Sequence, residues 1–228
     1  MTAPDSPDEI RRAVRRAMLG HIPFDGWSRA AFDMAVADAG VDAVLARDAF
    51  PNGPADVLAD AAAAGDAALL ERMNPPEPRE CPADRLTRAM ALRLDHNAGR
   101  EDAVRRGLTF LAAPGNAPLG MRLMMRTVDA VRTAAGDSAT GLRGMARRNA
   151  LASVYSAAML VWLEDGSEAR EVTRDFLARR LHPLTTAGSA LEQGMAGAAT
   201  IPRRMRAAAP GALPGPAVLD GEDGAAEP

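Results

Sequence analysis

The sequence predicts an all-α protein, and three observations support this fold class. Apolar residues, 47% of the 228, recur mainly at the three- and four-residue spacing of helices. Aromatic residues make up only 4%, whereas alanine, leucine, arginine and methionine, which favour helices, are abundant. No segment alternates polar and apolar residues as a half-buried strand would. We therefore expect a bundle of about nine helices with a flexible C-terminal tail.

The first three helices are predicted from their end signals. Ser6 to Glu9 reads as a capping box that begins the first helix, and Gly20 is expected to end it. Ser28 is expected to cap the second helix, and Asp42 a short third one. Gly40 separates these two helices, and their spacing is typical of a helix-turn-helix.

Six further helices are expected downstream. Gly65 is a candidate weak point in the first of them. Residues 74–82 contain four prolines and form the clearest internal boundary. We predict a helix-turn-helix-like part over 6–73, a second helical part over 83–182, and a weakly amphipathic to disordered tail over 184–228. The six helices are expected at about 55–73, 83–96, 100–112, 119–135, 142–163 and 168–182.

The charge of the helix-turn-helix-like segment argues against DNA binding. Residues 28–60 contain six aspartates and two arginines, a net charge of −4. Phosphate contacts supply most nonspecific affinity for DNA, so a negative reading helix is repelled and no nucleic-acid partner is expected. The positions expected to be exposed on that helix are Asp42, Ala43, Ala46, Arg47 and Asp48.

No pattern typical of an enzyme or a metal centre is found. His21, His96 and His182 lie far apart and have no neighbours at ligand spacing. The nucleophile-elbow, P-loop and dinucleotide-binding motifs are absent from the sequence. The single cysteine, Cys81, is interpreted as an incidental thiol in a reducing compartment. We therefore expect a non-enzyme with no catalytic residue, no metal and no cofactor.

Three apolar or amphipathic segments are instead candidates for core packing or for binding. Met121, Met124 and Met125 are interpreted either as gap-filling core or as the wall of an adaptable apolar pocket. The uncharged run over 150–163 is too short to span a bilayer and is expected to be a buried helix. Residues 201–206 form at best a weak amphipathic membrane segment.

Four motifs occur in order between about residues 9 and 182: PFDGW, AFPNG, APGNAPL followed by TVDA, and VYSAAMLVWLEDGSE. Together they resemble the coenzyme Q (ubiquinone) biosynthesis accessory family, whose members are lipid-binding, are not enzymes and have the tetracycline-repressor fold. The resemblance implies an isoprenoid lipid or quinone intermediate as ligand. The residues that it implies for the lipid pocket are Leu108, Leu111, Met124, Met125, Val128, Leu151, Tyr155, Met159 and Phe176.

The resemblance also implies partners. Members assist the di-iron demethoxyubiquinone hydroxylase and touch the membrane, so we expect a cytoplasmic protein peripherally associated with the bacterial inner membrane. A homodimer is one possible assembly of the chain. The alternative function is that of a ligand-responsive transcription regulator of the tetracycline-repressor type. The hydroxylase-facing patch is implied to contain Arg143, Met145, Arg147 and Arg148.

The chain departs from the family pattern in three places where aromatic or other bulky residues are common. Arg143-Gly144-Met145 stands where the family commonly has Asn-Trp-Tyr. Arg174 stands where it commonly has a Trp, and Arg132 where it has a Trp or a similar bulky residue. Aromatic anchors are frequent hot spots of interfaces. These departures put the contacts with the partner and with the membrane in question. They do not affect the expected fold.

Overall fold

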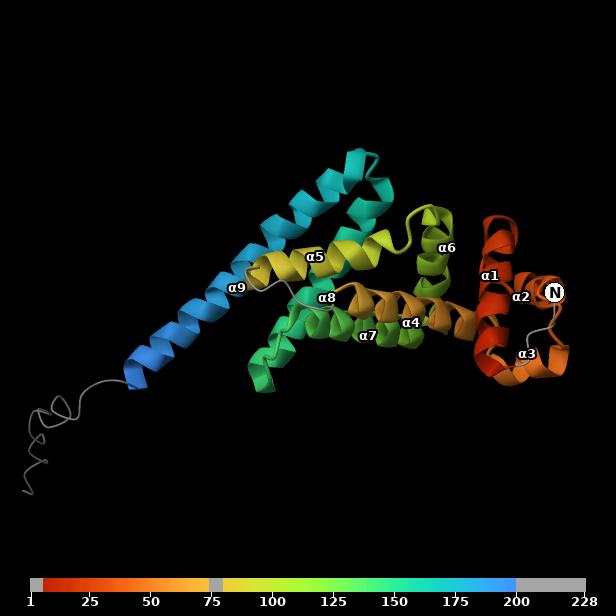
Figure 1. The fold of residues 1–228 in the computed structure, drawn as a ribbon, viewed down its shortest axis with the longest axis horizontal. Helices are drawn as coiled ribbons and strands as arrows, with labels where there is room; N and C mark the ends of the chain where they lie inside the picture. Colours follow the sequence, from red (N-terminus) through yellow and green to blue (C-terminus); the bar gives the residue numbers. More distant parts are fainter. Residues whose placement is uncertain (1–5, 74–79, 200–228) are drawn as a thin grey trace, which may run out of the picture. The chain divides into compact units, whose positions relative to one another are not determined.

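Helices form every regular element of the residues that the structure describes. The computed structural model describes residues 6–73 and 80–199, with side chains up to Thr185. The predicted all-α fold class is confirmed. The helices are α1 (Pro7–Asp25), α2 (Arg29–Asp38), α3 (Ala43–Ala49), α4 (Pro54–Arg72), α5 (Pro82–Asp95), α6 (Glu101–Ala112), α7 (Ala117–Ala135), α8 (Gly141–Glu164), a 3-10 turn (Glu168–Arg170) and α9 (Glu171–Ala199) (Figure 1).

Helix α1 begins as predicted but is longer than expected. Ser6 and Glu9 form the capping box, whereas Gly20 does not end the helix. The helix continues through Pro23 because Ile22, in the added turn, is completely buried, and packing outweighs the backbone hydrogen bond that proline removes. Gly26 ends the helix with a φ of 66°, and its N–H donates to the carbonyl of Ile22 at 2.9 Å.

Helices α2 and α3 form the predicted helix-turn-helix with the predicted caps. The Ser28 hydroxyl accepts from the backbone of Ala31 at 3.1 Å, and the Asp42 carboxylate accepts from that of Val44 at 2.8 Å. These bonds satisfy N–H groups that have no partner within the helix. Both helix starts were predictable because each cap lies within three residues of the N–H group from which it accepts.

The exposed face of α3 differs from the prediction. Ala46, expected to be exposed, is 1% exposed, because it lies one turn before the buried Phe50 on the face that packs inward. The outward face instead carries Val44, at 61% exposure, and Leu45, at 46%. The surface of this helix is therefore more apolar than the sequence suggested, and it still includes Asp42 and Asp48.

Two apolar clusters form the core, and α4 contributes to both. The N-terminal cluster joins α1, α2 and α3 to Val57 of α4, and the central cluster joins Leu69 of α4 to α5, α7, α8 and α9. Residues up to Gly188 form one compact unit. The two clusters therefore meet along α4. The expected boundary between two parts of the chain at residues 74–82 stays a prediction.

Helix α9 extends beyond the expected end at 182. It continues through Pro183 to Ala199 in a stretch rich in alanine, which has the highest helix propensity. The tail predicted from 184 is therefore helical at its start, and residues 201–206 lie outside the described residues. None of the helices among the described residues is long and apolar enough to cross a membrane.

Candidate binding cavity

A cavity of about 380 Å³ lies within the compact unit, between α1, α4, α5, α6, α7 and α8. Its volume lies toward the lower end of the range of small-molecule sites, roughly 300–1,000 Å³. The wall is mainly apolar, with one polar side and a basic rim. Its larger apolar residues are Leu19, Trp27, Leu58, Leu108, Leu111, Leu123, Met124 and Met159.

The polar side of the cavity is built on a buried ion pair between α4 and α5. The Arg93 side chain donates from Nε to Asp66 Oδ1 at 2.7 Å and from Nη2 to the Ala62 carbonyl at 3.2 Å. The Thr127 hydroxyl of α7 donates to the same Asp66 oxygen at 2.9 Å. Arg93 is only 5% exposed, so this contact joins three helices away from water.

Gly65 makes room for this ion pair. It was expected to weaken α4, but the helix is continuous across it. A Cβ atom at position 65 would lie 2.8 Å from Arg93 Cζ, a distance that real Cβ atoms do not tolerate. The glycine therefore allows the guanidinium to pack directly against the α4 backbone, at a cost in helix propensity of about 1 kcal/mol.

Two buried polar atoms on this side have no hydrogen-bond partner. They are Nη1 of Arg93 and the hydroxyl of Tyr155, and both residues belong to the cavity wall. Burial raises the pKa of Tyr155, and its phenol stays protonated at neutral pH. A buried polar group left unpaired costs roughly 1–3 kcal/mol, so two at one cavity require an explanation.

The rim of the cavity is basic. Arg12, Arg16 and Arg100 contribute to it, while Arg15 is held in an ion pair with Asp60 of α4. Burial lowers the pKa of His96, and nearby arginines, including Arg93, lower it further. His96 is therefore neutral at pH 7, and the positive charge of the rim comes from arginine alone.

The structure brings together five of the nine residues implied for the lipid pocket. Leu108, Leu111, Met124, Tyr155 and Met159 all line the cavity. Val128 and Leu151 are instead completely buried in the central cluster, and Phe176 packs against that cluster from α9. Met125 is half-buried and lies outside the cavity wall.

The contributions of α1, α4 and α5 to the cavity were not predicted from the sequence. Arg93 lies between the buried Met90 and Leu94, so an ionisable residue beside an apolar stripe was one available signal. Its partner Asp66 is 27 positions away, and helical spacing gives no information about such a pair.

The residues implied to face the hydroxylase fall into two groups. Arg148 of α8 forms two hydrogen bonds with Asp129 of α7, at 2.7 and 2.6 Å, and Arg147 lies 3.2 Å from Asp137. These two arginines stabilise the α7–α8 pair. Arg143 and Met145 are exposed.

Two of the three departures from the family pattern, at Arg132 and at Gly144, are structurally connected. Arg132 pairs with Asp137 at 3.0 Å and donates to the Ala139 carbonyl at 2.6 Å, which closes the turn before α8. That turn leaves no room for a side chain at Gly144, where a Cβ atom would lie 2.5 Å from the Ala139 oxygen. Arg174 lies 3.6 Å from Asp95. Arginine ion pairs thus occupy two of the places where the resemblance implied bulky residues.

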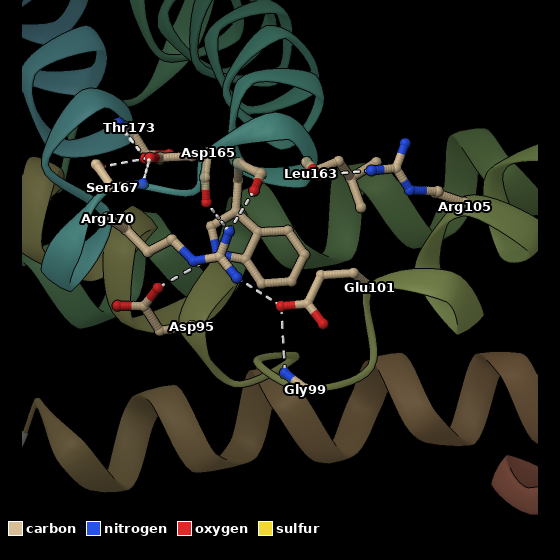
Figure 2. Close-up of polar contacts among 10 residues, drawn as sticks. Asp95, Gly99, Glu101, Arg105, Leu163, Asp165, Ser167, Arg170 and Thr173 are labelled. Carbon is tan, nitrogen blue, oxygen red and sulfur yellow. Dashed lines mark hydrogen bonds and ion pairs between the residues drawn. The ribbon is translucent and has the colours of Figure 1, made fainter.

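The last motif, VYSAAMLVWLEDGSE, runs along the end of α8 and finishes in the corner between α8 and α9 (Figure 2). Asp165 accepts hydrogen bonds from the backbone and hydroxyl groups of both Ser167 and Thr173, at 2.5 to 2.9 Å. Burial raises the pKa of Asp165, but these four bonds outweigh it and hold the pKa well below its usual value. The Arg170 guanidinium stacks on Trp162 and bonds to Glu101 at 2.5 Å. This motif is therefore structural at its end and contributes Tyr155 to the cavity at its start.

The PFDGW motif also contacts the cavity region. Its Trp27 donates from Nε1 to the Ala103 carbonyl of α6 at 3.1 Å and lies against Gly107. This contact attaches the α1–α2 corner to α6 and completes one wall. Within the described ranges, no group of histidine, cysteine and acidic side chains is arranged to hold a metal ion.

The COQ9 family model matches residues 117–188, from α7 into α9. Ubiquinone biosynthesis protein COQ9, mitochondrial, of Drosophila melanogaster is 26% identical over 76% of this chain and 55% of its own length. The Xenopus tropicalis protein of that name is 26% identical over 83% of this chain and 62% of its own length. The Homo sapiens protein of that name is 34% identical over 41% of this chain and 33% of its own length. The chain thus spans little more than half the length of the relatives it matches most extensively. The predicted resemblance to the coenzyme Q family is confirmed.

A solved structure shows the same fold. The TetR transcriptional regulator from Nitrosomonas europaea has a TM-score of 0.62 and 20% sequence identity, and the match covers 77% of this chain and 98% of that one. The predicted tetracycline-repressor-like fold is therefore confirmed.

Proposed function

We propose that this protein is a lipid-binding accessory protein of ubiquinone biosynthesis that holds an isoprenoid quinone intermediate in the cavity. The observation that carries the proposal is an apolar cavity inside a chain that resembles COQ9 proteins from α7 into α9. Five residues implied by the resemblance line that cavity, although they come from three different helices. The protein acts by binding and not as an enzyme, and the lipid is its ligand in place of a cofactor.

Such a cavity would keep the apolar part of the ligand out of water. Each exposed methylene of an isoprenoid tail costs about 0.8 kcal/mol in water. A cavity of about 380 Å³ accommodates a ring and the first part of a tail, but not a long tail. The remainder of the tail stays in the bilayer, so the protein works at the membrane surface, which we place at the cytoplasmic face of a bacterial inner membrane.

The proposed partner is the di-iron hydroxylase that acts on demethoxyubiquinone. The start of α8 supports this assignment, because Leu142 is 85% exposed and Met145 63% exposed next to the exposed Arg143. Apolar side chains beside a cation form a surface suited to a protein interface. Arg148, through Asp129 of α7, and Arg147, through Asp137 of the turn after α7, hold the start of α8 in place.

Two measurements test the proposed function. Native mass spectrometry of the purified full chain, followed by lipid extraction, should find a co-purifying isoprenoid lipid. Quinone profiling of a deletion strain should find less ubiquinone and an accumulation of demethoxyubiquinone. A lipid-free protein together with an unchanged quinone profile would contradict the proposal.

The alternative of a transcription regulator rests on the fold alone. The solved neighbour is a regulator, but α3 of this chain exposes Val44, Leu45, Arg47 and Asp48, which include a single cation. Phosphate contact requires several cations. Salt-dependent binding of the protein to DNA duplex from upstream of its own gene would favour this alternative over the accessory role.

A further inference from the structure

The unpaired donors of Arg93 and Tyr155 indicate how a ligand lies in the cavity. Both residues belong to its wall, and Nη1 and the phenol are buried without a hydrogen-bond partner. The two groups lie close enough for the Arg93 charge to affect the pKa of Tyr155. An arginine nitrogen only donates, and a protonated phenol readily donates, so the missing group is an acceptor.

Local charge further defines that acceptor. The positive charge of Arg93 is already balanced by Asp66, whose Oδ1 also accepts from Thr127. An additional anion would lie near the Asp66 carboxylate, whereas an uncharged oxygen would gain two donors without that repulsion. A ring carbonyl has two lone pairs and meets these requirements.

We propose that Arg93 and Tyr155 donate hydrogen bonds to a carbonyl oxygen on the ring of the bound lipid. This inference rests on the proposed function. The ring then lies against the polar wall formed by α4, α5 and α8, and the tail extends along Leu108, Leu111 and Met124. The opposite orientation, with the polar end at Arg16 and Arg100 of the rim, is an outcome that the test distinguishes.

Tyr155→Phe provides a specific test. The substitution removes one hydroxyl that has no partner within the described structure, so it leaves folding intact. The purified full chain is titrated with a dimethoxy-methyl-benzoquinone carrying a decyl chain, and separately with decylbenzene, which has the same tail and no carbonyl. Both affinities are measured by displacement of N-phenyl-1-naphthylamine. Val44→Ser, at an exposed residue of α3 outside the cavity wall, is the control variant. Arg100→Gln, at the rim, tests the opposite orientation.

We expect Tyr155→Phe to weaken quinone binding about two- to tenfold, as for one hydrogen bond, and to leave decylbenzene binding unchanged. Val44→Ser should leave both affinities unchanged. The inference is overturned if Tyr155→Phe changes neither affinity, if it weakens both ligands equally, or if only Arg100→Gln weakens the quinone. If the wild type binds neither ligand, the proposed function fails as well; if it binds both and only the Tyr155 effect is missing, lipid binding stands.

A spectroscopic measurement adds a readout that a change in packing would not mimic. The chain contains a single tyrosine, so ¹³C label at Cζ gives one resonance that belongs to Tyr155. The quinone should move this resonance through a new hydrogen bond, whereas decylbenzene should not. Equal shifts with the two ligands would contradict a hydrogen bond to the carbonyl.

Discussion

The N-terminal cluster and the cavity region differ in what they bury. None of the buried residues described in α1, α2 and α3, which form most of the N-terminal cluster, is polar or charged. Among the described residues, the buried polar or charged ones are Asp66, Arg93, Thr127, Asp165 and Thr173, and all five lie outside that cluster. Buried polar groups are costly, and natural proteins retain them where they fix a specific geometry or bind a ligand. The difference supports the proposal that the helix-turn-helix serves as scaffold and that a ligand is recognised at the cavity.

The largest effect on stability is expected from breaking the buried ion pair. Arg93→Met should lower the free energy of unfolding by about 3–5 kcal/mol, because Asp66 keeps its charge and loses its main partner. Urea unfolding measures the change. Arg29→Met, which breaks the exposed pair with Asp33, is the matched control and should change stability by less than about 1 kcal/mol. If both substitutions lowered the free energy of unfolding equally, the buried ion pair at the cavity would be no more important for stability than the exposed ion pair of α2.

A second substitution tests the corner between α8 and α9. Asp165→Ala removes the acceptor of four hydrogen bonds and should lower stability by about 2–3 kcal/mol at pH 7. The folded-state pKa of Asp165 lies below the unfolded value of about 3.9, so its stabilisation is complete above that value and is lost as the pH falls through the folded pKa. The difference between wild type and variant should therefore shrink below about pH 4. Unfolding curves recorded from pH 7 to pH 2 check this, and a difference that grows on acidification would contradict it.

Gly65→Ala tests the close contact on α4. The added methyl group would collide with the Arg93 guanidinium, so a substitution that normally stabilises a helix should here destabilise the protein by about 1–3 kcal/mol. Gly20→Ala in α1 is the control, because no atom lies within 4 Å of a Cβ at that position, and it should stabilise by up to about 1 kcal/mol. Thermal unfolding compares the pair, and stabilisation by both would show that Arg93 moves away without cost.

The smallest effects are expected on the surface of α3. Val44→Ser and Arg47→Ala should each change stability by less than about 0.5 kcal/mol, since both side chains are exposed. Quinone affinity should be unchanged in both variants if α3 is only scaffold. A loss of binding in either variant would extend the functional region into the helix-turn-helix.

The helices were largely predictable because their end signals are local. The caps at Ser28 and Asp42 and the prolines at the starts of α4, α5 and α7 lie within a few residues of the ends that they define. The end of α1 was missed because the burial of Ile22 depends on residues from other helices. Ala46 was misplaced for the same reason, since packing of α3 decides which face is buried.

The cavity was only partly predictable. The resemblance supplied Met124, Tyr155 and Met159, because these residues lie within or near long motifs. The pair of Arg93 and Asp66 was missed because it joins two helices separated by the region around 74–82. Hydrophobic spacing identifies which face of a helix is buried, but it does not reveal two distant polar residues that meet there.

The most direct test of the central claim compares two neighbouring substitutions on α8. Met159→Trp fills the cavity, whereas Leu160→Trp adds the same side chain at a residue that is 61% exposed. Native mass spectrometry of the purified full chains should find isoprenoid lipid on the wild type and on Leu160→Trp, and little or none on Met159→Trp. Equal lipid occupancy in the two variants, or a wild type that carries no lipid, would contradict the claim that the cavity is the lipid-binding site.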